Sequence, residues 1–280
     1  MEEIIQGQGD PEETKTAMGA KEGAAEGTAA SGAQEAAAGE TAASGTQEAE
    51  AEAAVEAVVA GVHNYSGEDA YVMPEDPWVL KKLEWFKDQK LGLMMHWGPY
   101  SQLGIVESWA LSDRDADWSR EGIDWEVTGE EFKKEYFALN KTFNPLRFEP
   151  EKWADLAKEA GMRYLLFTTK HHDGFCMWDT RETDYKITSE ECPFHTAPNA
   201  DVVKELFRAF GERDFMIGAY FSKPDWNSPY YWSDRWQHGD RNVNYKIKEH
   251  PWMWEKFCDF TYNQVKELMT GYRNIDIIWL

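Results

Sequence analysis

Cysteine is scarce in this sequence: three residues among 280, Cys176, Cys192 and Cys258, with no two in CxxC spacing. An odd number of widely spaced cysteines excludes a disulfide framework and argues against a structural zinc site. We therefore expect three reduced thiols, as in a cytosolic protein.

Long apolar runs are also missing. No segment approaches the ~18 consecutive apolar residues of a membrane-spanning helix, and the N-terminus has no basic start followed by an apolar stretch, as a signal peptide would have. We expect no membrane partner and a cytoplasmic location.

Basic residues are outnumbered. There are 29 Lys and Arg against 51 Asp and Glu, which gives a formal net charge of -22. Such a protein would be repelled by a phosphate backbone, so we expect no nucleic acid partner. A neutral substrate would be indifferent to this charge.

The first 71 residues contain none of the fourteen tryptophans, and residues 1–60 hold thirteen acidic residues against two lysines. The unit TAASGAQEA at 28–36 returns at 41–49 as TAASGTQEA. Glycine interrupts this repeat and no apolar stripe runs through it, so burial cannot offset its ordering entropy. We predict a disordered, acidic, low-complexity tail at 1–71, either an inert extension or an interaction tether, and a folded domain at 72–280.

Beyond residue 72, short apolar segments alternate with segments of helical spacing. This alternation predicts parallel βαβ units and therefore an α/β fold. We expect strands at 91–97, 164–169, 216–222 and 275–280, and helices at 153–160, 201–210 and 252–272.

Spacing distinguishes between two α/β architectures. A complete (β/α)8 barrel takes roughly 250 residues, whereas about 200 residues here supply four strands followed by long polar, aromatic loops. A doubly wound sheet is the alternative, but no GxGxxG turn follows any strand. We predict a (β/α)8 TIM-like barrel of which only about the first four βα units are present.

Polar and aromatic side chains follow the predicted strands at their ends, where barrels keep their active sites. Four strand ends that carry such residues predict one pocket more strongly than any single residue does. The residues are His96, Trp97, Glu107, Ser108 and Trp109 after the first strand; Lys170, His171, His172 and Asp173 after the second; Tyr220, Ser222, Asp225 and Trp226 after the third; and Trp279 in the fourth.

These residues also have simpler interpretations. A single histidine such as His96 is more often a satisfied core residue, and most loop tryptophans pack. His171 and His172 are neighbours, which face opposite sides of a strand and reach one pocket only where the chain turns. That geometry argues against a metal site, because adjacent histidines on a regular strand do not converge on one ion. We assign no catalytic role to Asp276, inside the last strand.

Three tryptophans, Trp109, Trp226 and Trp279, stand beside the proposed mouth. Flat rings suit the C–H faces of a sugar, and neutral histidines can donate to and accept from its hydroxyls. The residues alone predict a barrel with a sugar-like pocket and no cofactor, and leave the reaction open.

The segments that carry these residues resemble the α-L-fucosidases of glycoside hydrolase family 29. The likeness covers about residues 78–280, and HWGxYS followed by KHHDGF is a highly specific pair. The matching segments are LGLMMHWGPYSQLG (91–104), 143–187 with KHHDGF, 200–222, and YRNIDIIWL (272–280).

The resemblance implies retaining hydrolysis of terminal α-L-fucose from glycoconjugates, with a fucosylated oligosaccharide or glycoside as partner. One carboxylate attacks the anomeric carbon and a second, ~5–5.5 Å away, acts as acid and then as base. By this resemblance His96, His171 and His172 hold fucose hydroxyls, Tyr220 and Trp279 line the same subsite, and Glu107 and Trp109 match a Glu-Trp pair that grips the sugar, with Ser108 between them here.

In the family the nucleophilic aspartate follows the fourth-strand tryptophan as W-x-D, whereas here Trp279 is followed by Leu280 and no further residue. We therefore expect no catalytic carboxylate in this chain, no fucosidase activity from the chain alone, and self-association through exposed half-barrel edges. The alternatives are a non-catalytic fragment or sugar-binding remnant and, third, a metal-assisted hydrolase.

Overall fold

The computed structural model describes residues 73–280, except 113, 115, 121–128 and 239. The tail predicted at 1–71 lies outside the described residues. The domain predicted at 72–280 is described from Met73 onward.

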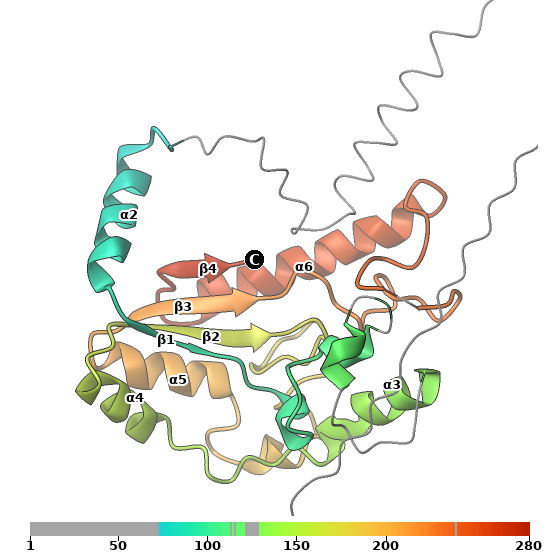
Figure 1. The fold of residues 1–280 in the computed structure, drawn as a ribbon, viewed down its shortest axis with the longest axis horizontal. Coiled ribbons are helices and arrows are strands. Elements are labelled where there is room, and N and C mark those ends of the chain that lie inside the picture. Colours follow the sequence, from blue (N-terminus) through green and yellow to red (C-terminus); the bar gives the residue numbers. More distant parts are fainter. Residues whose placement is uncertain (1–72, 113, 115, 121–128, 239) are drawn as a thin grey trace, which may run out of the picture. The chain divides into compact units, whose positions relative to one another are not determined.

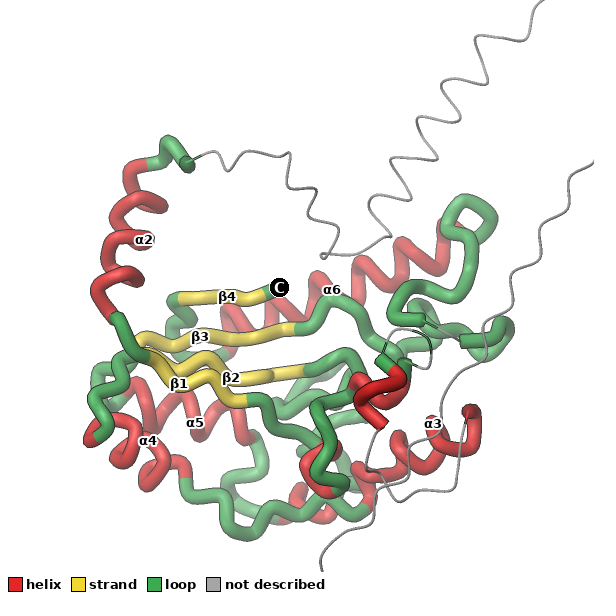
Figure 2. The backbone as a smooth tube through the Cα atoms, in the orientation of Figure 1, coloured by secondary structure: helices red, strands yellow, loops and turns green. Residues whose placement is uncertain are grey.

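Four parallel strands form one sheet in the order β1-β2-β3-β4, which confirms the predicted α/β class (Figures 1 and 2). The arrowheads of β1, β2 and β3 point to the same end, where the long loops gather (Figure 1). Three of the strands are shorter than predicted, because their flanking residues already belong to loops. The strands are β1 (Gly92–Met95), β2 (Tyr164–Lys170), β3 (Met216–Phe221) and β4 (Ile277–Trp279).

Helices connect the strands, and the three predicted helices are confirmed to within three residues. They are α4 (Pro150–Glu159), α5 (Val202–Gly211) and α6 (Pro251–Gly271). Two further helices, α2 (Pro77–Gln89) and α3 (Gly129–Phe137), are absent from the prediction. Short 3-10 helices lie at Pro99–Gln102, Trp109–Leu111, Asp117–Arg120, Ala138–Lys141 and Pro193–Thr196.

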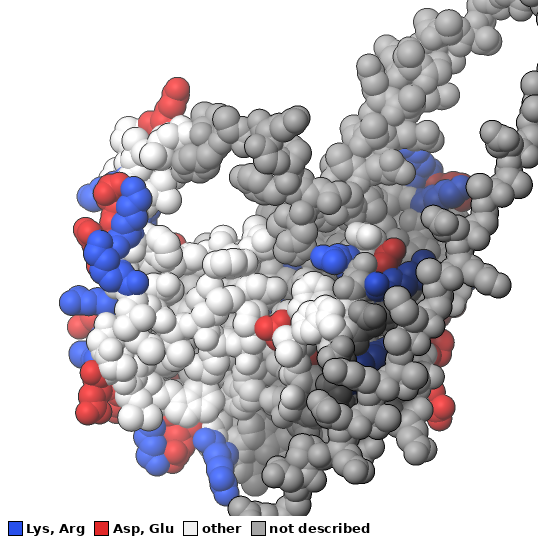
Figure 3. Space-filling view, in the orientation of Figure 1, with Lys and Arg blue, Asp and Glu red and all other residues white. Residues whose placement is uncertain are grey.

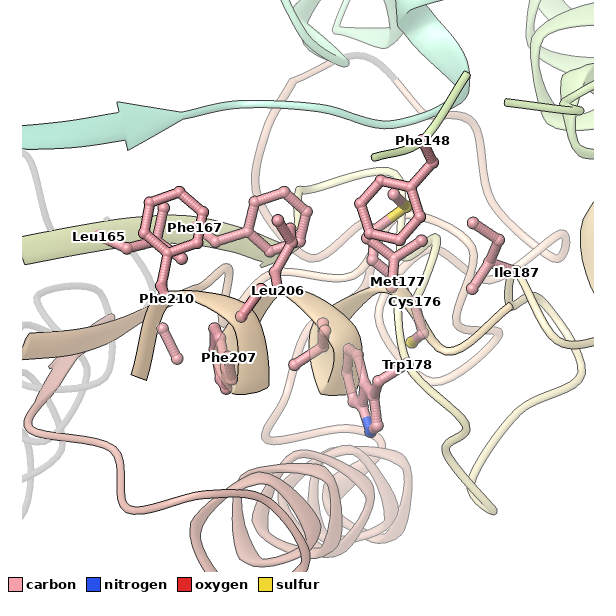
Figure 4. Close-up of a cluster of buried hydrophobic side chains, with 14 of the residues drawn as sticks. Phe148, Leu165, Phe167, Cys176, Met177, Trp178, Ile187, Leu206, Phe207 and Phe210 are labelled. Atoms are coloured by element: carbon pink, nitrogen blue, oxygen red, sulfur yellow. The ribbon is translucent and has the colours of Figure 1, made fainter. Parts of the chain in front are cut away.

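The main hydrophobic core lies between the centre of the sheet and α5 (Figure 4). Successive residues of a strand face opposite sides, so alternate residues of β2 and β3 enter this core. Leu165 and Phe167 on β2 and Ile217, Ala219 and Phe221 on β3 are all buried in it. This burial fixes the two central strands against the helical layer.

The other side of this core comes from α5. The side chain of Asp201, a residue type preferred at this position, caps the helix by accepting a hydrogen bond from the backbone nitrogen of Lys204 at 3.0 Å. Leu206, Phe207 and Phe210 are fully buried in the same cluster (Figure 4). Burying side chains of this size stabilises a fold by about 1.5–3 kcal/mol each, so α5 is firmly attached.

A second buried cluster lies in the loops that follow the strands and in the helices beside them. Its members come from the loops after β1 and β3 and from α3 and α6, so their packing ties these segments together. Such packing lets a loop hold a side chain in a fixed place. The members are Tyr100, Ala110, Leu111, Phe132, Tyr136, Trp226, Tyr231, Trp232 and Phe257.

The outer strands and the face of the sheet opposite the core are more exposed. Met94 on β1 is 47% exposed and Trp279 on β4 is 52% exposed. In the space-filling view few charged side chains lie over the strands, whereas Lys, Arg, Asp and Glu gather around α2 (Figure 3). The described residues thus leave apolar side chains accessible along the edges of the sheet.

All three cysteines are free thiols, as their spacing predicts. Cys176 and Cys192 are buried, and this burial raises the pKa of each thiol. Protonated, buried thiols are poor nucleophiles. Within the described ranges no helix combines the length and the apolar character needed to cross a membrane.

Candidate active site

One row of residues crosses the sheet near the carboxyl ends of the strands. Thr168 on β2 is in register with Tyr220 on β3, and Tyr220 with Trp279 on β4. His96 directly follows β1 and reaches the hydroxyl of Thr168. Residues in register on neighbouring strands point to the same face, so this row lies on the face opposite the helical core.

The ring of His96 is oriented by Thr168. Its Nδ1 lies 2.7 Å from the Thr168 Oγ1, which lies 3.0 Å from the backbone carbonyl of Met95. A carbonyl can only accept, so the single hydroxyl proton of Thr168 goes to Met95 and the oxygen accepts from the Nδ1–H of His96. This tautomer leaves a lone pair on Nε2, which faces Glu107.

His171 and His172 follow β2 and lie side by side, with ring centroids 4.4 Å apart. The chain leaves strand geometry after Lys170, and the register with β3 shifts between Thr168 and Lys170. The sequence predicts that both rings reach one pocket only where the chain turns, and in the structure the two rings lie side by side just past the strand end. The Nδ1 of His171 lies 2.5 Å from the Ser108 Oγ, and that of His172 is hydrogen-bonded to the Ser222 hydroxyl.

The carboxylate of Glu107 lies at the centre of these groups. Its Oε2 accepts from the indole nitrogen of Trp109 at 3.0 Å and lies 3.4 Å from the Nε2 of His171, while its Oε1 lies 3.7 Å from the Nε2 of His96. Glu107 has a φ of 51°, a left-handed backbone conformation that costs a non-glycine residue roughly 1–2 kcal/mol. The packed loop thus holds a locally unfavourable conformation that aims this carboxylate at the histidines.

Glu107 is ionised and the histidines are neutral near pH 7. The hydrogen bond from His171 lowers the pKa of Glu107 despite its partial burial, and the positive charges that His171 and His96 carry in acid lower it further. Burial lowers the pKa of His96 and of His171, although Glu107 opposes the shift. The site therefore offers one negative charge and imidazoles that can both donate and accept.

Trp109 forms an aromatic wall of the site. Its ring centroid lies 4.8 Å from that of His172 and 6.0 Å from that of Trp226. Trp226 in turn stacks on Trp232 at 4.8 Å, within the second buried cluster. The guanidinium of Arg241 lies 5.5 Å from the Trp109 ring. This wall is therefore anchored in the packed loops.

Tyr220 lies beside two of the histidines, with its ring 4.8 Å from that of His96 and parallel to that of His171 at 5.9 Å. Burial, with the nearby charge of Glu107, raises the pKa of Tyr220 to about 12, so its hydroxyl stays protonated. Trp279 shares the strand row with Tyr220 but, among the described residues, takes part in no ring contact with the others. The structure thus brings six of the seven predicted site residues together and leaves Trp279 at the edge.

A buried ion pair that no sequence pattern reveals supports the site from β2. Lys170 is completely buried, and its Nζ donates to Asp225 and to Gln264, each at 2.9 Å. Asp225 also accepts from the backbone nitrogen of Ser228 at 2.9 Å. Because Lys170 precedes the two histidines, this network joins their strand end to the loop after β3 and to α6.

Asp173 is buried behind the histidines. It accepts from the hydroxyl of Tyr136 at 3.0 Å and from the backbone nitrogen of Phe175 at 3.2 Å. Burial outweighs these hydrogen bonds and raises the pKa of Asp173 to about 7. Its contacts lie in the loop and α3, so we regard it as a structural carboxyl.

Asp276 lies at the other end of the sheet. Its Oδ2 accepts from the backbone nitrogen of Ile217 near the start of β3, and its Oδ1 lies 3.2 Å from the Nζ of Lys82 on α2. The absence of a catalytic assignment for Asp276 therefore agrees with its position. Two side chains that the sequence did not single out as orienting groups, Ser108 and Thr168, belong to the site instead.

Comparisons with known proteins identify the family. Neutral imidazoles, one carboxylate and aromatic rings at the carboxyl ends of parallel strands suit a polyhydroxylated ligand. The family model for alpha-L-fucosidase matches residues 62–280. The chain belongs to the alpha-L-fucosidases of glycoside hydrolase family 29, which confirms the resemblance found in the sequence.

Relatives of known sequence are distant but consistent. A putative alpha-L-fucosidase of Caenorhabditis elegans is 28% identical over 202 residues, which are 70% of this chain and 36% of the relative. The tissue alpha-L-fucosidase of Bos taurus is 32% identical over 158 residues, or 54% of this chain and 31% of the relative. The chain thus spans about a third of the length of these relatives.

Solved structures agree. The alpha-L-fucosidase of Bacteroides thetaiotaomicron has a TM-score of 0.56 and 31% identity over 75% of this chain and 42% of that one. AlfC from Lactobacillus casei, in complex with alpha-L-fucose product, has a TM-score of 0.52 and 32% identity over 71% of this chain and 60% of that one. These neighbours imply a TIM-like barrel domain.

Proposed function

We propose that the described residues form the first four βα units of a (β/α)8 barrel, and that their pocket is part of the fucose subsite of a retaining α-L-fucosidase. The observation that carries the proposal is the convergence of His96, His171 and His172 with Glu107 at the carboxyl ends of the strands. Neutral imidazoles and one carboxylate can together bind several neighbouring hydroxyls of one sugar.

The ligand class is supported by the similar structures. AlfC has been solved with alpha-L-fucose product, and a bacterial fucosidase with a monovalent iminocyclitol inhibitor. We propose a terminal α-L-fucosyl group of an oligosaccharide or glycoside as the ligand. Its hydroxyls would meet the histidines and Glu107, while Trp109 and Tyr220 would cover its apolar faces.

The retaining mechanism is supported by a trapped covalent intermediate of the Bacteroides thetaiotaomicron fucosidase. A retaining enzyme needs two carboxyl groups ~5–5.5 Å apart, one as nucleophile and one as acid and base. In the described part of this chain, Glu107 is the one carboxylate that contacts the histidine cluster, and Trp109 and His171 hold it as a binding group. We therefore propose that the 280-residue chain binds fucose but does not hydrolyse fucosides by itself.

The test has two parts. First, L-fucose is titrated into the purified 280-residue chain by calorimetry, with D-fucose as a stereochemical control. Saturable binding of L-fucose that His171→Ala weakens at least tenfold supports the pocket, whereas His195→Ala, outside the cluster, should bind as the parent does. Equal binding of both sugars, or unchanged binding in His171→Ala, would contradict it.

Second, the same chain is incubated with an aryl α-L-fucoside. We expect no release of the aryl alcohol, because a single carboxylate cannot both form and hydrolyse the glycosyl intermediate. Turnover that disappears in Glu107→Gln would overturn the proposed inactivity. Binding without turnover would favour a sugar-binding chain over a self-sufficient enzyme.

A further inference from the structure

Three groups of the pocket have the arrangement of metal ligands. One ligand atom from each of His96, Glu107 and His171 lies within 4.8 Å of the other two, and both histidines approach Glu107 through Nε2. We propose that His96, Glu107 and His171 bind a divalent transition-metal ion of the zinc class, and that this ion competes with the sugar. The competition rests on the proposed function, whereas the metal binding does not.

The distances suit such an ion. Zinc binds histidine nitrogen and carboxylate oxygen at about 2.0–2.2 Å, which puts neighbouring ligands of a tetrahedral site about 3.4 Å apart. The Nε2 of His171 lies 3.4 Å from the Glu107 Oε2, and the Nε2 of His96 lies 3.7 Å from the Glu107 Oε1. The widest separation, at most 4.8 Å, would close by up to about 1.4 Å to reach tetrahedral spacing.

Both histidines are already oriented for this role. Ligating histidines usually hydrogen-bond through the ring nitrogen that does not bind the metal. Thr168 accepts from the Nδ1 of His96 and leaves the Nε2 lone pair free for an ion. Ser108 contacts the Nδ1 of His171, and its hydroxyl can accept from that nitrogen once Nε2 binds the metal.

The ligand types select the class of ion. Two imidazoles and one carboxylate suit zinc, copper, nickel or iron, whereas magnesium and calcium require mainly oxygen ligands. Adjacent histidines on a regular strand do not converge on one ion, which is why the sequence argues against a metal at His171 and His172. In the structure the partner of His171 in this set is His96, from the end of the neighbouring strand, while His172 is bonded to Ser222.

Sugar and ion would need the same atoms. In the proposed function the fucose hydroxyls meet His96, His171, His172 and Glu107, and three of these four groups are the ligands of the ion. An occupied metal site therefore takes three of the four polar groups from the sugar, and the two ligands compete. The ion would act as an inhibitor of sugar binding.

The experiment uses the purified 280-residue chain, first stripped with EDTA and dialysed. ZnCl2 is titrated by calorimetry, and CoCl2 is added separately so that the visible spectrum reports coordination. We expect one ion per chain and an affinity at least tenfold lower in each of His96→Ala, Glu107→Gln and His171→Ala. Two controls, His195→Ala and Cys258→Ser, test adventitious binding and should match the parent chain.

The outcomes separate the two claims. No stoichiometric binding, or binding lost in the controls but kept in the three ligand variants, overturns the metal site. Folding of each variant is checked by near-UV circular dichroism, and His96→Gln replaces His96→Ala if the latter unfolds. Rising L-fucose should weaken zinc binding to the parent chain. Zinc binding unaffected by saturating L-fucose overturns the competition alone, and L-fucose binding without zinc binding overturns the metal site while the proposed function stands.

Discussion

The central and outer strands of this one sheet are built differently. Six of the seven residues of β2 and five of the six of β3 are buried, whereas β1 and β4 have none that is buried. Yet the strand row takes His96 from the end of β1 and Trp279 from β4. The centre therefore provides a rigid base, while side chains at the margin depend on neighbours for their position.

We expect the largest difference in stability when an ion pair at the centre of the sheet and one at its edge are each broken. Lys170→Met leaves Asp225 as a buried, uncompensated charge and should lower the free energy of unfolding by about 3–5 kcal/mol. Lys82→Met removes the exposed pair with Asp276 and should cost about 0–1 kcal/mol. Urea unfolding of both variants measures the difference, and equal losses would contradict the contrast.

The same substitution on two strands sharpens the comparison. Ile217 on β3 is 2% exposed, whereas Ile278 on β4 faces the same side but is only partly buried. Ile217→Ala should cost about 2–5 kcal/mol, and Ile278→Ala less than half of that, because a poorly covered side chain leaves no closed cavity. Thermal unfolding of both variants checks the ratio. A larger loss at Ile278 would show that β4 is as firmly packed as the centre.

The raised pKa of the buried Asp173, which follows β2, should make the stability of the fold depend on pH. Its pKa is about 7 in the folded chain against an ordinary value of 3.8, so its contribution is complete below about pH 4 and is lost as pH rises through 7. Asp173→Asn should remove that decline, a difference on the order of 2–4 kcal/mol between pH 4 and 8. Urea midpoints at several pH values measure it. An unchanged pH profile would show that Asp173 is ionised in the fold.

The exposed outer strands should also make the chain self-associate in solution. Met94 and Trp279 are about half exposed on the outer strands, and exposed apolar edges promote association. We expect reversible self-association of the 280-residue chain, weakened about tenfold, or ~1.4 kcal/mol, by Met94→Lys with Trp279→Lys. Sedimentation velocity over a concentration series checks this, with Lys134→Glu on α3 as a charge control. A monomer at all concentrations would contradict it.

The smallest effect concerns orientation within the site. Ser108→Ala removes the hydroxyl that contacts the Nδ1 of His171, and one such hydrogen bond is worth about 0.5–1.5 kcal/mol. L-fucose affinity should fall about two- to tenfold, while Ser108→Thr restores most of it. Calorimetry measures both variants. No loss in Ser108→Ala would show that packing alone orients the ring.

Much of the fold was predictable from the sequence because its signals are local. Apolar runs and helical spacing predict the four strands and three helices, and Asp201 is visible as a cap. The prediction lacks α2, although Asp76 and Pro77 form a capping signal there, because no residue of that helix is buried. A helix without buried residues has no strong apolar stripe, so its sequence lacks the periodic pattern that reveals a helix.

The residues that form the site could be predicted from the sequence, but the residues that hold them in place could not. The histidines and Tyr220 stand at strand ends, so their convergence follows from parallel topology, whereas Glu107 and Trp109 lie well inside the loop after β1. The pairing of Lys170 with Asp225 spans 55 residues, and no local pattern encodes it. Trp97 shows the opposite case: it lies beside His96 in sequence but packs against Phe148 and Trp153, as the alternative of simple packing predicts.

One row of site residues crosses the four strands, so the pocket forms only when the strands pair in the correct register. A slip of one residue between β1 and β2 would turn His96 toward the helices and present Met95 in its place. Misaligned chains would then have no intact pocket, and an analogue of the sugar that we propose as ligand would bind and stabilise only the correctly aligned ones. Such an analogue would act on this chain as a chemical chaperone that rescues misfolding by selecting one alignment.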